Sequence, residues 1–310
     1  MANFAMIFPG QGSQSSGMLG DLAKKFVIIK KTFLESSDIL GYDLWNFLQN
    51  ASETELNKTS KTQPIVLSTS VSIFRIWQEI NGKMPQFMAG HSLGEYSALV
   101  CSGVLDFQEA IKLVELRGKL MQKVFPKGKG GMYAIIGLDN ESVSKICYDI
   151  SKNKTVSPAN FNAPNQIVIA GNKKDVEKAA LLCKYAGAKY IIPLSISVPS
   201  HCMLMKPAAK KLEKALKKIK FHNPKIPIVN NVDVKIEFCI NKIKNALVRQ
   251  MYSPVRWVEI IQFLSKRKIS NFIEIGPGKI LTKLTKRINN KINVIAINDI
   301  NSLKIASITH

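Results

Sequence analysis

The segment Gln86-Phe-Met-Ala-Gly-His-Ser-Leu-Gly-Glu-Tyr-Ser-Ala-Leu-Val-Cys-Ser-Gly103 carries the strongest structural signal in this chain. Its start predicts a short strand over Gln86–Ala89 that ends at Gly90, and the small and apolar residues from Gly94 onward predict a helix that can pack closely on a sheet. The residues between them, Gly-His-Ser-Leu-Gly, fit the pattern G-x-S-x-G, in which a serine occupies a sharp turn between a strand and a helix. We therefore predict an α/β fold built around this strand-turn-helix unit.

Strand and helix signals alternate through the first 124 residues, which indicates a parallel sheet covered by helices. The segment Pro126-Lys-Gly-Lys-Gly-Gly131 is rich in glycine and lysine and predicts a flexible joint. The β-α-β-α-β pattern after it is compact enough for a ferredoxin-like unit. We expect a large α/β domain with a parallel-sheet core over residues 1–124 and 199–310, and an inserted ferredoxin-like α+β domain over residues 125–198.

The periodicity of apolar residues sets the expected bounds of these elements. The strands are expected at Phe4–Phe8, Gln86–Ala89, Met132–Gly137, Gln166–Ala170, Lys189–Leu194, Ile226–Asn230 and Phe272–Ile275. The helices are expected at Pro64–Gln78, from Gly94 onward, and at Phe107–Val124, Glu141–Ser151 and Asp175–Ala186.

Ser92 is the candidate nucleophile. The flanking glycines are needed because a side chain two residues before or after the serine would collide with the strand or the helix. The turn exposes the hydroxyl, and the N-terminus of the helix points free backbone N–H groups toward a developing oxyanion. An ordinary strand-to-helix turn without chemistry is the alternative interpretation.

A serine hydroxyl is a weak nucleophile until a base takes its proton, and the chain has four histidines. His310 is terminal, His222 lies in a polar loop, and His91 is expected to point away from Ser92. His201 follows the constrained stretch Ser-Val-Pro-Ser, so we predict it as the general base. No acidic residue is obviously placed to orient it, and a backbone carbonyl could hold the imidazole tautomer instead. A structural histidine is the alternative.

The loop Pro9-Gly-Gln-Gly-Ser-Gln14 opens directly from the first strand, with Gln11 at its head. Its exposed backbone N–H groups are candidates for the second donor that an oxyanion hole requires. A loop that cradles a phosphate is the rival interpretation, although neither G-x-G-x-x-G nor G-x-x-x-x-G-K-[ST] fits here.

Arg117 falls on the apolar stripe of the helix expected over Phe107–Val124. A guanidinium that faces the interior needs an anion, because an unpaired buried charge is costly. An internal salt bridge or a side chain that reaches out to solvent would satisfy it. A clamp for a substrate carboxylate is the functional interpretation, since the planar guanidinium binds carboxylates through two hydrogen bonds.

Composition narrows the class of protein. A chain of 310 residues can bury a sizeable core, and no run approaches the roughly eighteen apolar residues of a membrane span. The first residues do not have the pattern of a signal peptide. The five cysteines are widely spaced and contain no CxxC pair, which predicts reduced core thiols in a cytoplasmic protein.

The formal net charge of +22 has three interpretations. The lysines are scattered among isoleucines and asparagines, as compositional drift with a benefit to solubility would produce. An acidic protein partner is the second interpretation. Nucleic acid is the third, and no Arg-rich arm, zinc-ligand spacing or mixed aromatic and basic platform supports it.

Taken together, these residues resemble the malonyl-CoA:acyl carrier protein transacylases of bacterial fatty-acid synthesis, over nearly the whole chain. The matching segments are Phe8–Gln14, Gly90–Ala98, Arg117, Val198–Cys202, Asn230–Asp233 and the run from Val248-Arg-Gln250 to Glu274-Ile-Gly-Pro-Gly278. The resemblance implies a hydrolase-like α/β domain that carries a ferredoxin-like insert. It also implies a ping-pong transfer of malonate from malonyl-CoA to the pantetheine thiol of acyl carrier protein, with no metal and no cofactor beyond the coenzyme A thioester substrate.

The resemblance assigns roles to individual residues as well. These are acylation of Ser92, proton transfer by His201, an oxyanion hole from the backbone amides of Gln11 and Leu93, a grip on the malonyl carboxylate by Arg117, and orientation of His201 by Gln250. An esterase or thioesterase with the same turn, or a non-catalytic subunit with the same fold, are the rival functions.

The implied partner, acyl carrier protein, is acidic, so a basic surface would speed the encounter. The candidates are Lys210, Lys214 and Lys217 on one helix face, and Lys286 with Arg287; a solvated helix face is the alternative. A monomer that binds neither nucleic acid nor membranes is expected.

Overall fold

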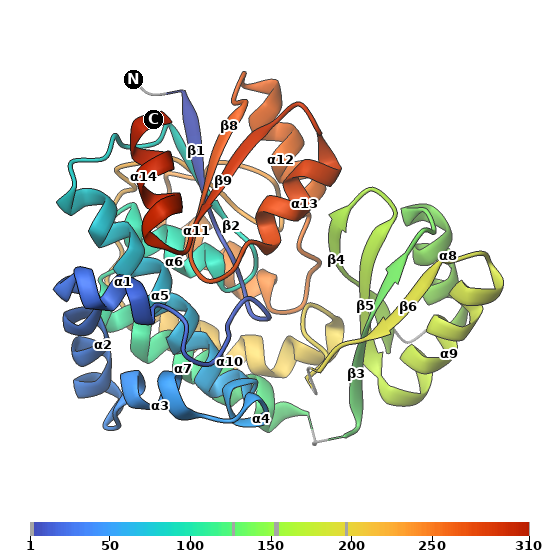
Figure 1. The fold of residues 1–310 in the computed structure, drawn as a ribbon. Helices are drawn as coiled ribbons and strands as arrows, with labels where there is room; N and C mark the ends of the chain where they lie inside the picture. The colour runs from blue at the N-terminus through green and yellow to red at the C-terminus, as the bar shows by residue number, and fades with distance from the viewer. Residues whose placement is uncertain (1–2, 126–127, 152–154, 196–197, 310) are drawn as a thin grey trace.

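The computed structural model describes residues 3–125, 128–151, 155–195 and 198–309. It contains two separate sheets, each with its own hydrophobic cluster (Figure 1). In the larger sheet the paired strands all run parallel, in the order β7-β2-β1-β8-β9. Their bounds are β1 Phe4–Phe8, β2 Phe87–Gly90, β7 Ile228–Val229, β8 Asn271–Ile275 and β9 Asn293–Ile297.

Strand β1 lies in the middle of the larger sheet and is buried along its whole length, because every one of its side chains is apolar. It pairs with β2 in a register that sets Phe8 opposite Gly90, and with β8 on its other side. The carboxyl ends of these parallel strands therefore meet at one edge, where open α/β sheets place their ligands. The Pro9–Gln14 loop and the serine turn both leave the sheet there.

Helices cover both faces of the larger sheet (Figure 1). They are α1 Gly20–Lys25, α2 Val27–Leu40, α3 Leu44–Asn50, α4 Glu53–Leu56, α5 Thr59–Glu79, α6 Gly94–Cys101, α7 Phe107–Val124, α10 Lys206–Lys218, α11 Ile240–Gln250, α12 Trp257–Lys266, α13 Ile280–Ile288 and α14 Ile300–Thr309. Helix α5 begins before Pro64, where the sequence predicted its start. The buried face of α5 extends back to Thr59, so packing tolerates a proline inside the helix.

The smaller sheet is antiparallel, in the order β4-β5-β3-β6. Its elements follow the chain order β-α-β-β-α-β, with α8 and α9 on one face. Their bounds are β3 Gly130–Ile136, α8 Asn140–Ile150, β4 Val156–Ala163, β5 Gln166–Asn172, α9 Lys173–Tyr185 and β6 Tyr190–Pro193. This is the ferredoxin-like arrangement. The α/β fold class predicted from the sequence is confirmed.

Two details of the smaller sheet differ from the sequence-based expectation. Strand β4 was not predicted, because Pro158 and three polar residues interrupt its apolar pattern. Its pairing with β5 shifts register between Pro158 and Asn160 and again between Phe161 and Ala163. The predicted joint over residues 126–131 is too long, since Gly130 and Gly131 already belong to β3. Residues 126–127 of that joint lie outside the described residues.

Strand β4 brings the smaller sheet against the larger one. The N–H of Phe161 donates to the carbonyl of Val255 at 2.9 Å, and the N–H of Val255 donates to the carbonyl of Ala159 at 2.9 Å. Strand β4 also packs on α12 and α13 (Figure 1). The smaller sheet is therefore held beside the serine turn, although the exact domain boundaries stay a prediction.

Candidate active site

Ser92 has a backbone φ of +52°, in the left-handed region that residues with a side chain seldom adopt. The two glycines of the motif allow this turn. A Cβ on Gly90 would lie 1.9 Å from the carbonyl carbon of Gly94, and a Cβ on Gly94 would lie 2.0 Å from the carbonyl oxygen of Phe8. Strand and helix thus meet with no room for side chains, as the sequence motif predicted, and the serine is held in a strained conformation.

The Oγ of Ser92 lies 2.7 Å from Nε2 of His201, which is 4% exposed. The other ring nitrogen, Nδ1, lies 2.7 Å from the backbone carbonyl oxygen of Gln250. A carbonyl only accepts hydrogen bonds, so Nδ1 carries the proton of the neutral ring and Nε2 is left to accept the serine hydroxyl. The N–H of His201 donates to the carbonyl of Met251 at 3.1 Å and holds the backbone in place.

Burial, and secondarily the nearby charge of Arg117, lower the pKa of His201 to about 3. The imidazole is therefore neutral at pH 7, which is the form that can accept a proton from Ser92. An imidazole with so low a pKa binds a proton weakly. To act as an efficient base, His201 needs a hydrogen-bonding partner that becomes polarised, or a change in the charge around it that raises its pKa.

Arg117 is 2% exposed, and it lies on the buried face of α7 as the periodicity predicted. Its guanidinium donates from Nη1 to Oε1 of Gln63 at 2.9 Å and from Nη2 to Oε1 of Gln250 at 3.1 Å. Nη2 also lies 3.3 Å from the Oγ of Ser92. Within the described residues it forms no ion pair, and its Nε has no hydrogen-bond partner. Neither the internal salt bridge nor a side chain that reaches solvent is therefore seen.

Two backbone N–H groups expected in the oxyanion hole lie beside the serine turn. Leu93 precedes the first residue of α6. Gln11 follows Gly10, where an added Cβ would lie 2.6 Å from the carbonyl oxygen of His91. In the described parts of the chain, no group accepts a hydrogen bond from either N–H. The N–H of Ser92 itself is already occupied, because it donates to Asn231 Oδ1 at 2.7 Å.

Three polar residues of this site were given no role from the sequence. Gln63 contacts Arg117 from α5, Asn231 contacts the serine turn from the end of β7, and Glu95 lies in the first turn of α6. All three are nearly fully buried. A polar residue at an otherwise apolar position is the only signal the sequence offers for them, and it does not identify their partners.

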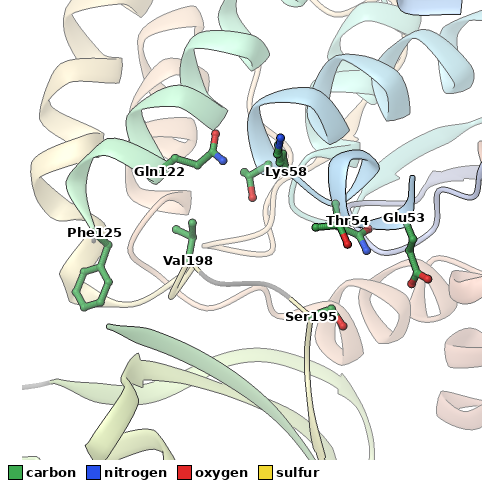
Figure 2. Close-up of a pocket in the computed structure, with 9 residues that line it drawn as sticks. Glu53, Thr54, Lys58, Gln122, Phe125, Ser195 and Val198 are labelled. Atoms are coloured by element: carbon green, nitrogen blue, oxygen red, sulfur yellow. The ribbon is translucent and has the colours of Figure 1, made fainter. Parts of the chain in front are cut away.

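A cleft lies beside Gln11. One pocket of about 530 Å³ is lined by residues that include Lys58 and Gln122, and a second of about 430 Å³ includes Gln11. The two pockets share Glu53, Asn57 and Ser195. Figure 2 shows the first pocket between α7, the start of α5 and the chain that leaves the smaller sheet. The side chain of Gln11 donates to Oγ1 of Thr59, a lining residue of the first pocket, at 3.3 Å.

The rings of two other histidines contact groups other than Ser92 Oγ, and the third lies outside the residues that the structure describes. His91 Nε2 is 2.8 Å from Asn162 Oδ1 on β4, so its ring faces the smaller sheet. His222 lies 4.0 Å from Asp106 and is partly exposed. His310 lies outside the described residues.

The five cysteines are free, and Cys101 is half-buried and packs against the main hydrophobic cluster. Cys239 is exposed, so the prediction that all five are core thiols is wrong for this one. No described group of three or more His, Cys, Asp or Glu residues could hold a metal ion. None of the helices in the described ranges combines the length and hydrophobicity that a membrane span requires.

Comparison of the chain with known proteins identifies the enzyme family to which it belongs. The acyl transferase domain family matches residues 5–306, so the chain is an acyltransferase of this α/β class. Within it, the chain belongs to the malonyl CoA-acyl carrier protein transacylase family.

Three relatives illustrate the match. The malonyl CoA-acyl carrier protein transacylase of Haemophilus influenzae is 56% identical over 303 residues, which cover 97% of each chain. The acyl carrier protein S-malonyltransferase of Vibrio cholerae is 55% identical, with a TM-score of 0.95 over 98% of this chain and 99% of that chain. A malonyl-transacylase solved in complex with a type II PKS acyl-carrier protein is 57% identical, with a TM-score of 0.98 over 100% of both chains.

Proposed function

We propose that this chain transfers a malonyl group from malonyl-CoA to the pantetheine thiol of acyl carrier protein through a malonyl ester on Ser92. The 2.7 Å contact between Ser92 Oγ and His201 Nε2, with the guanidinium of Arg117 3.3 Å from the same oxygen, carries the proposal. The relatives named as malonyl CoA-acyl carrier protein transacylases support the same substrates.

In the first half-reaction Ser92 Oγ attacks the thioester carbonyl while His201 Nε2 takes the hydroxyl proton. The negative charge that develops on the carbonyl oxygen is stabilised by the N–H groups of Gln11 and Leu93. When the C–S bond breaks, coenzyme A leaves as a thiol with the proton from His201. The carbonyl of Gln250 keeps the proton on Nδ1 throughout, so Nε2 remains the exchanging nitrogen.

In the second half-reaction the thiol of the carrier attacks the ester carbonyl. His201 takes the thiol proton and returns it to Ser92 Oγ as the ester C–O bond breaks. The two thioesters are chemically alike, so the transfer is near balance and needs neither a metal nor a cofactor. A substrate carboxylate and a bound carrier in the cleft would also limit the access of water to the ester.

Arg117 is proposed to bind the free carboxylate of the malonyl group. Its charge is buried and has no anionic partner among the described residues, so a substrate carboxylate would compensate the cost of burying it. The same contact would help the base. Because the charge of Arg117 contributes to the lowered pKa of His201, neutralising it with malonate raises that pKa toward a useful value.

Mass spectrometry of the intact chain after brief exposure to malonyl-CoA without an acceptor tests the proposal. One malonyl group is expected on Ser92, and Ser92→Ala is expected to carry none. Addition of acyl carrier protein should then move the label to the carrier, with little free malonate. Rapid release of free malonate instead of malonyl-carrier would identify a hydrolase, and absence of any adduct would support a non-catalytic role.

The basic residues expected to receive the carrier are all exposed. Lys210, Lys214 and Lys217 lie on the outer face of α10, and Lys286 and Arg287 lie in the last turn of α13. We include in the proposal that one of these two surfaces attracts the acidic carrier. The relative solved in complex with its acyl-carrier protein supports a carrier as the partner, and α13 packs directly against β4 beside the site.

A further inference from the structure

Glu95 is a buried carboxyl group that the mechanism above does not use. It lies in the first turn of α6, three residues after Ser92, and is 3% exposed. Its Oε2 accepts two hydrogen bonds, from Nε2 of Gln250 at 2.8 Å and from the backbone N–H of Asn231 at 3.1 Å. The carboxyl group therefore contacts two residues that both reach the serine turn.

Through Gln250, Glu95 is linked to Arg117. A glutamine side chain has a donor end and an acceptor end, and only one end can face each neighbour. The Gln250 amide nitrogen donates to Oε2 of Glu95 at 2.8 Å and to the backbone carbonyl of Ser92 at 3.1 Å, so the Gln250 oxygen must face the other way. There it accepts from Nη2 of Arg117 at 3.1 Å. If the amide were reversed, its NH₂ group would face the guanidinium, and two donors would repel each other.

Through Asn231, Glu95 also reaches the backbone of the turn. The side chain of Asn231 accepts from the N–H of Ser92 at 2.7 Å and donates to the carbonyl of Gly90 at 2.6 Å. It therefore holds the turn from both sides of the nucleophile. The hydrogen bond from the Asn231 N–H to Glu95 fixes the backbone that carries this side chain.

We propose that Glu95 is a positioning residue: it sets the orientation of the Gln250 amide and thereby aims the Arg117 guanidinium at the acyl group on Ser92. The inference rests on the proposed function, because it assigns to Glu95 a part in the selection of a malonyl group. Glu95 touches neither the substrate nor the reacting atoms, and it acts only through Gln250 and Asn231.

The ionisation of Glu95 gives this role a pH dependence. Burial raises the pKa of Glu95 to about 7, against the opposing effects of its hydrogen bonds and of Arg117. The other charged or titratable groups around it are Tyr96 on α6, Asp233 after β7 and Glu237, which lines the same small void. Above about pH 7 the carboxylate only accepts hydrogen bonds, so it enforces the observed amide orientation. Below that pH the acid can also donate, and the orientation is less strictly set.

The test compares malonyl-CoA and acetyl-CoA as donors for labelling of Ser92 in the full chain, with KM and rate measured separately. Glu95→Met keeps the volume and removes the acceptor. We expect the KM for malonyl-CoA to rise about 10- to 100-fold, with acetyl labelling reduced less than about threefold.

Glu95→Gln keeps an acceptor oxygen but cannot ionise. It should stay within about threefold of the natural chain and lose the change of malonyl preference between about pH 6 and about pH 8.

Glu274→Gln is the matched control, because Glu274 is a second buried carboxyl whose pKa is raised to about 7, and its hydrogen bonds go to Leu281 and Thr282 of α13. This variant should keep the pH dependence of malonyl preference. Thermal melting shows whether each variant folds. If Glu95→Met does not fold, the inference is tested by comparing the pH dependence of malonyl preference in Glu95→Gln with that in the natural chain.

Three results would overturn the inference. They are an equal loss of malonyl and acetyl labelling in Glu95→Met, a malonyl preference in the natural chain that does not change with pH, and a Glu95→Gln variant that retains the natural pH profile. A natural chain that takes no malonyl group on Ser92 would overturn the proposed function and this inference together.

Discussion

Two strand-to-helix turns leave the larger sheet on either side of β1, and they use the same geometry differently. One follows β2 and carries Ser92 into α6, and the other follows β8 and leads through Gly276 into α13. Both turns need glycine. A Cβ on Gly276 would lie 2.6 Å from the Pro9 ring, just as a Cβ on Gly90 would meet Gly94. Both helices present their positive N-terminal ends at one edge of the sheet.

The difference lies in what satisfies the free N–H groups of each helix. At α13, the carboxyl oxygens of Glu274 accept from the N–H groups of Leu281 at 3.0 Å and Thr282 at 2.7 Å. At the start of α6, the N–H groups of Gly94 and Glu95 donate to the carbonyls of His91 and Ser92, and within the described residues the N–H of Leu93 has no acceptor. A helix start capped by a carboxylate is a structural joint, whereas a free N–H such as that of Leu93 can stabilise an oxyanion.

The two buried carboxyl groups differ in the same way. Burial raises the pKa of both Glu95 and Glu274 to about 7. Glu274 is held by the backbone and hydroxyl of Thr282 and by the backbone of Leu281. Glu95 is held partly by a side-chain amide that itself contacts Arg117. Loss of Glu274 should therefore change stability, and loss of Glu95 should change selectivity.

The largest expected effect comes from removing the general base, which acts at the serine turn and not at the turn after β8. His201→Ala should slow acylation of Ser92 by malonyl-CoA about 10²- to 10⁴-fold, because among the described residues the other side chain that contacts Oγ is the guanidinium of Arg117, which cannot accept a proton. Stopped-flow or quenched mass spectrometry measures the rate, and Lys304→Ala at an exposed position of α14 serves as the control. An acylation rate within a few fold of the natural chain would exclude His201 as the base.

Arg117→Ala should have the next largest effect. Without the guanidinium, malonyl preference over acetyl is expected to fall about 10- to 100-fold, mainly through malonyl labelling. Removal of its charge also removes one cause of the lowered pKa of His201, so acetyl labelling should be maintained or increase. Competition between the two donors measures the ratio, and an unchanged ratio would contradict the clamp.

Salt should affect the second half-reaction more modestly. Between about 0.1 M and about 1 M salt, transfer to acyl carrier protein is expected to slow about three- to tenfold, because screening weakens attraction of an acidic partner to Lys286 and its neighbours. Transfer to a small pantetheine thiol should change less. Equal sensitivity of both acceptors would remove the basic docking surface from the proposal.

Glu274→Gln should give the smallest effect on activity, less than about twofold in acylation rate. Because the pKa of Glu274 is raised in the folded chain, its contribution to stability is present below about pH 4.5 and is lost as the pH rises through about 7. The melting temperature of the variant should therefore improve relative to the natural chain between about pH 5 and about pH 8. A difference that does not vary with pH would show that Glu274 does not titrate in this range.

Sequence reasoning located the reactive turn well because its requirements are local. Strand β1 and helix α7 have the predicted bounds, and the glycines around Ser92 are where their close contacts require them. Sequence patterns did not predict an element that forms mainly through contacts with other parts of the fold. Strand β4 has an irregular apolar pattern and is formed by pairing with β5 and by contact with Val255.

Local sequence patterns are enough to predict a serine in a glycine-lined turn after a buried strand, and an arginine on the buried face of a helix. Which groups meet at that turn depends on how distant segments of the chain pack together. Ser92 and His201 are 109 residues apart, and Arg117 and Gln250 are 133 apart. Such contacts depend on the order and register of the parallel strands, which side-chain patterns along one segment do not encode.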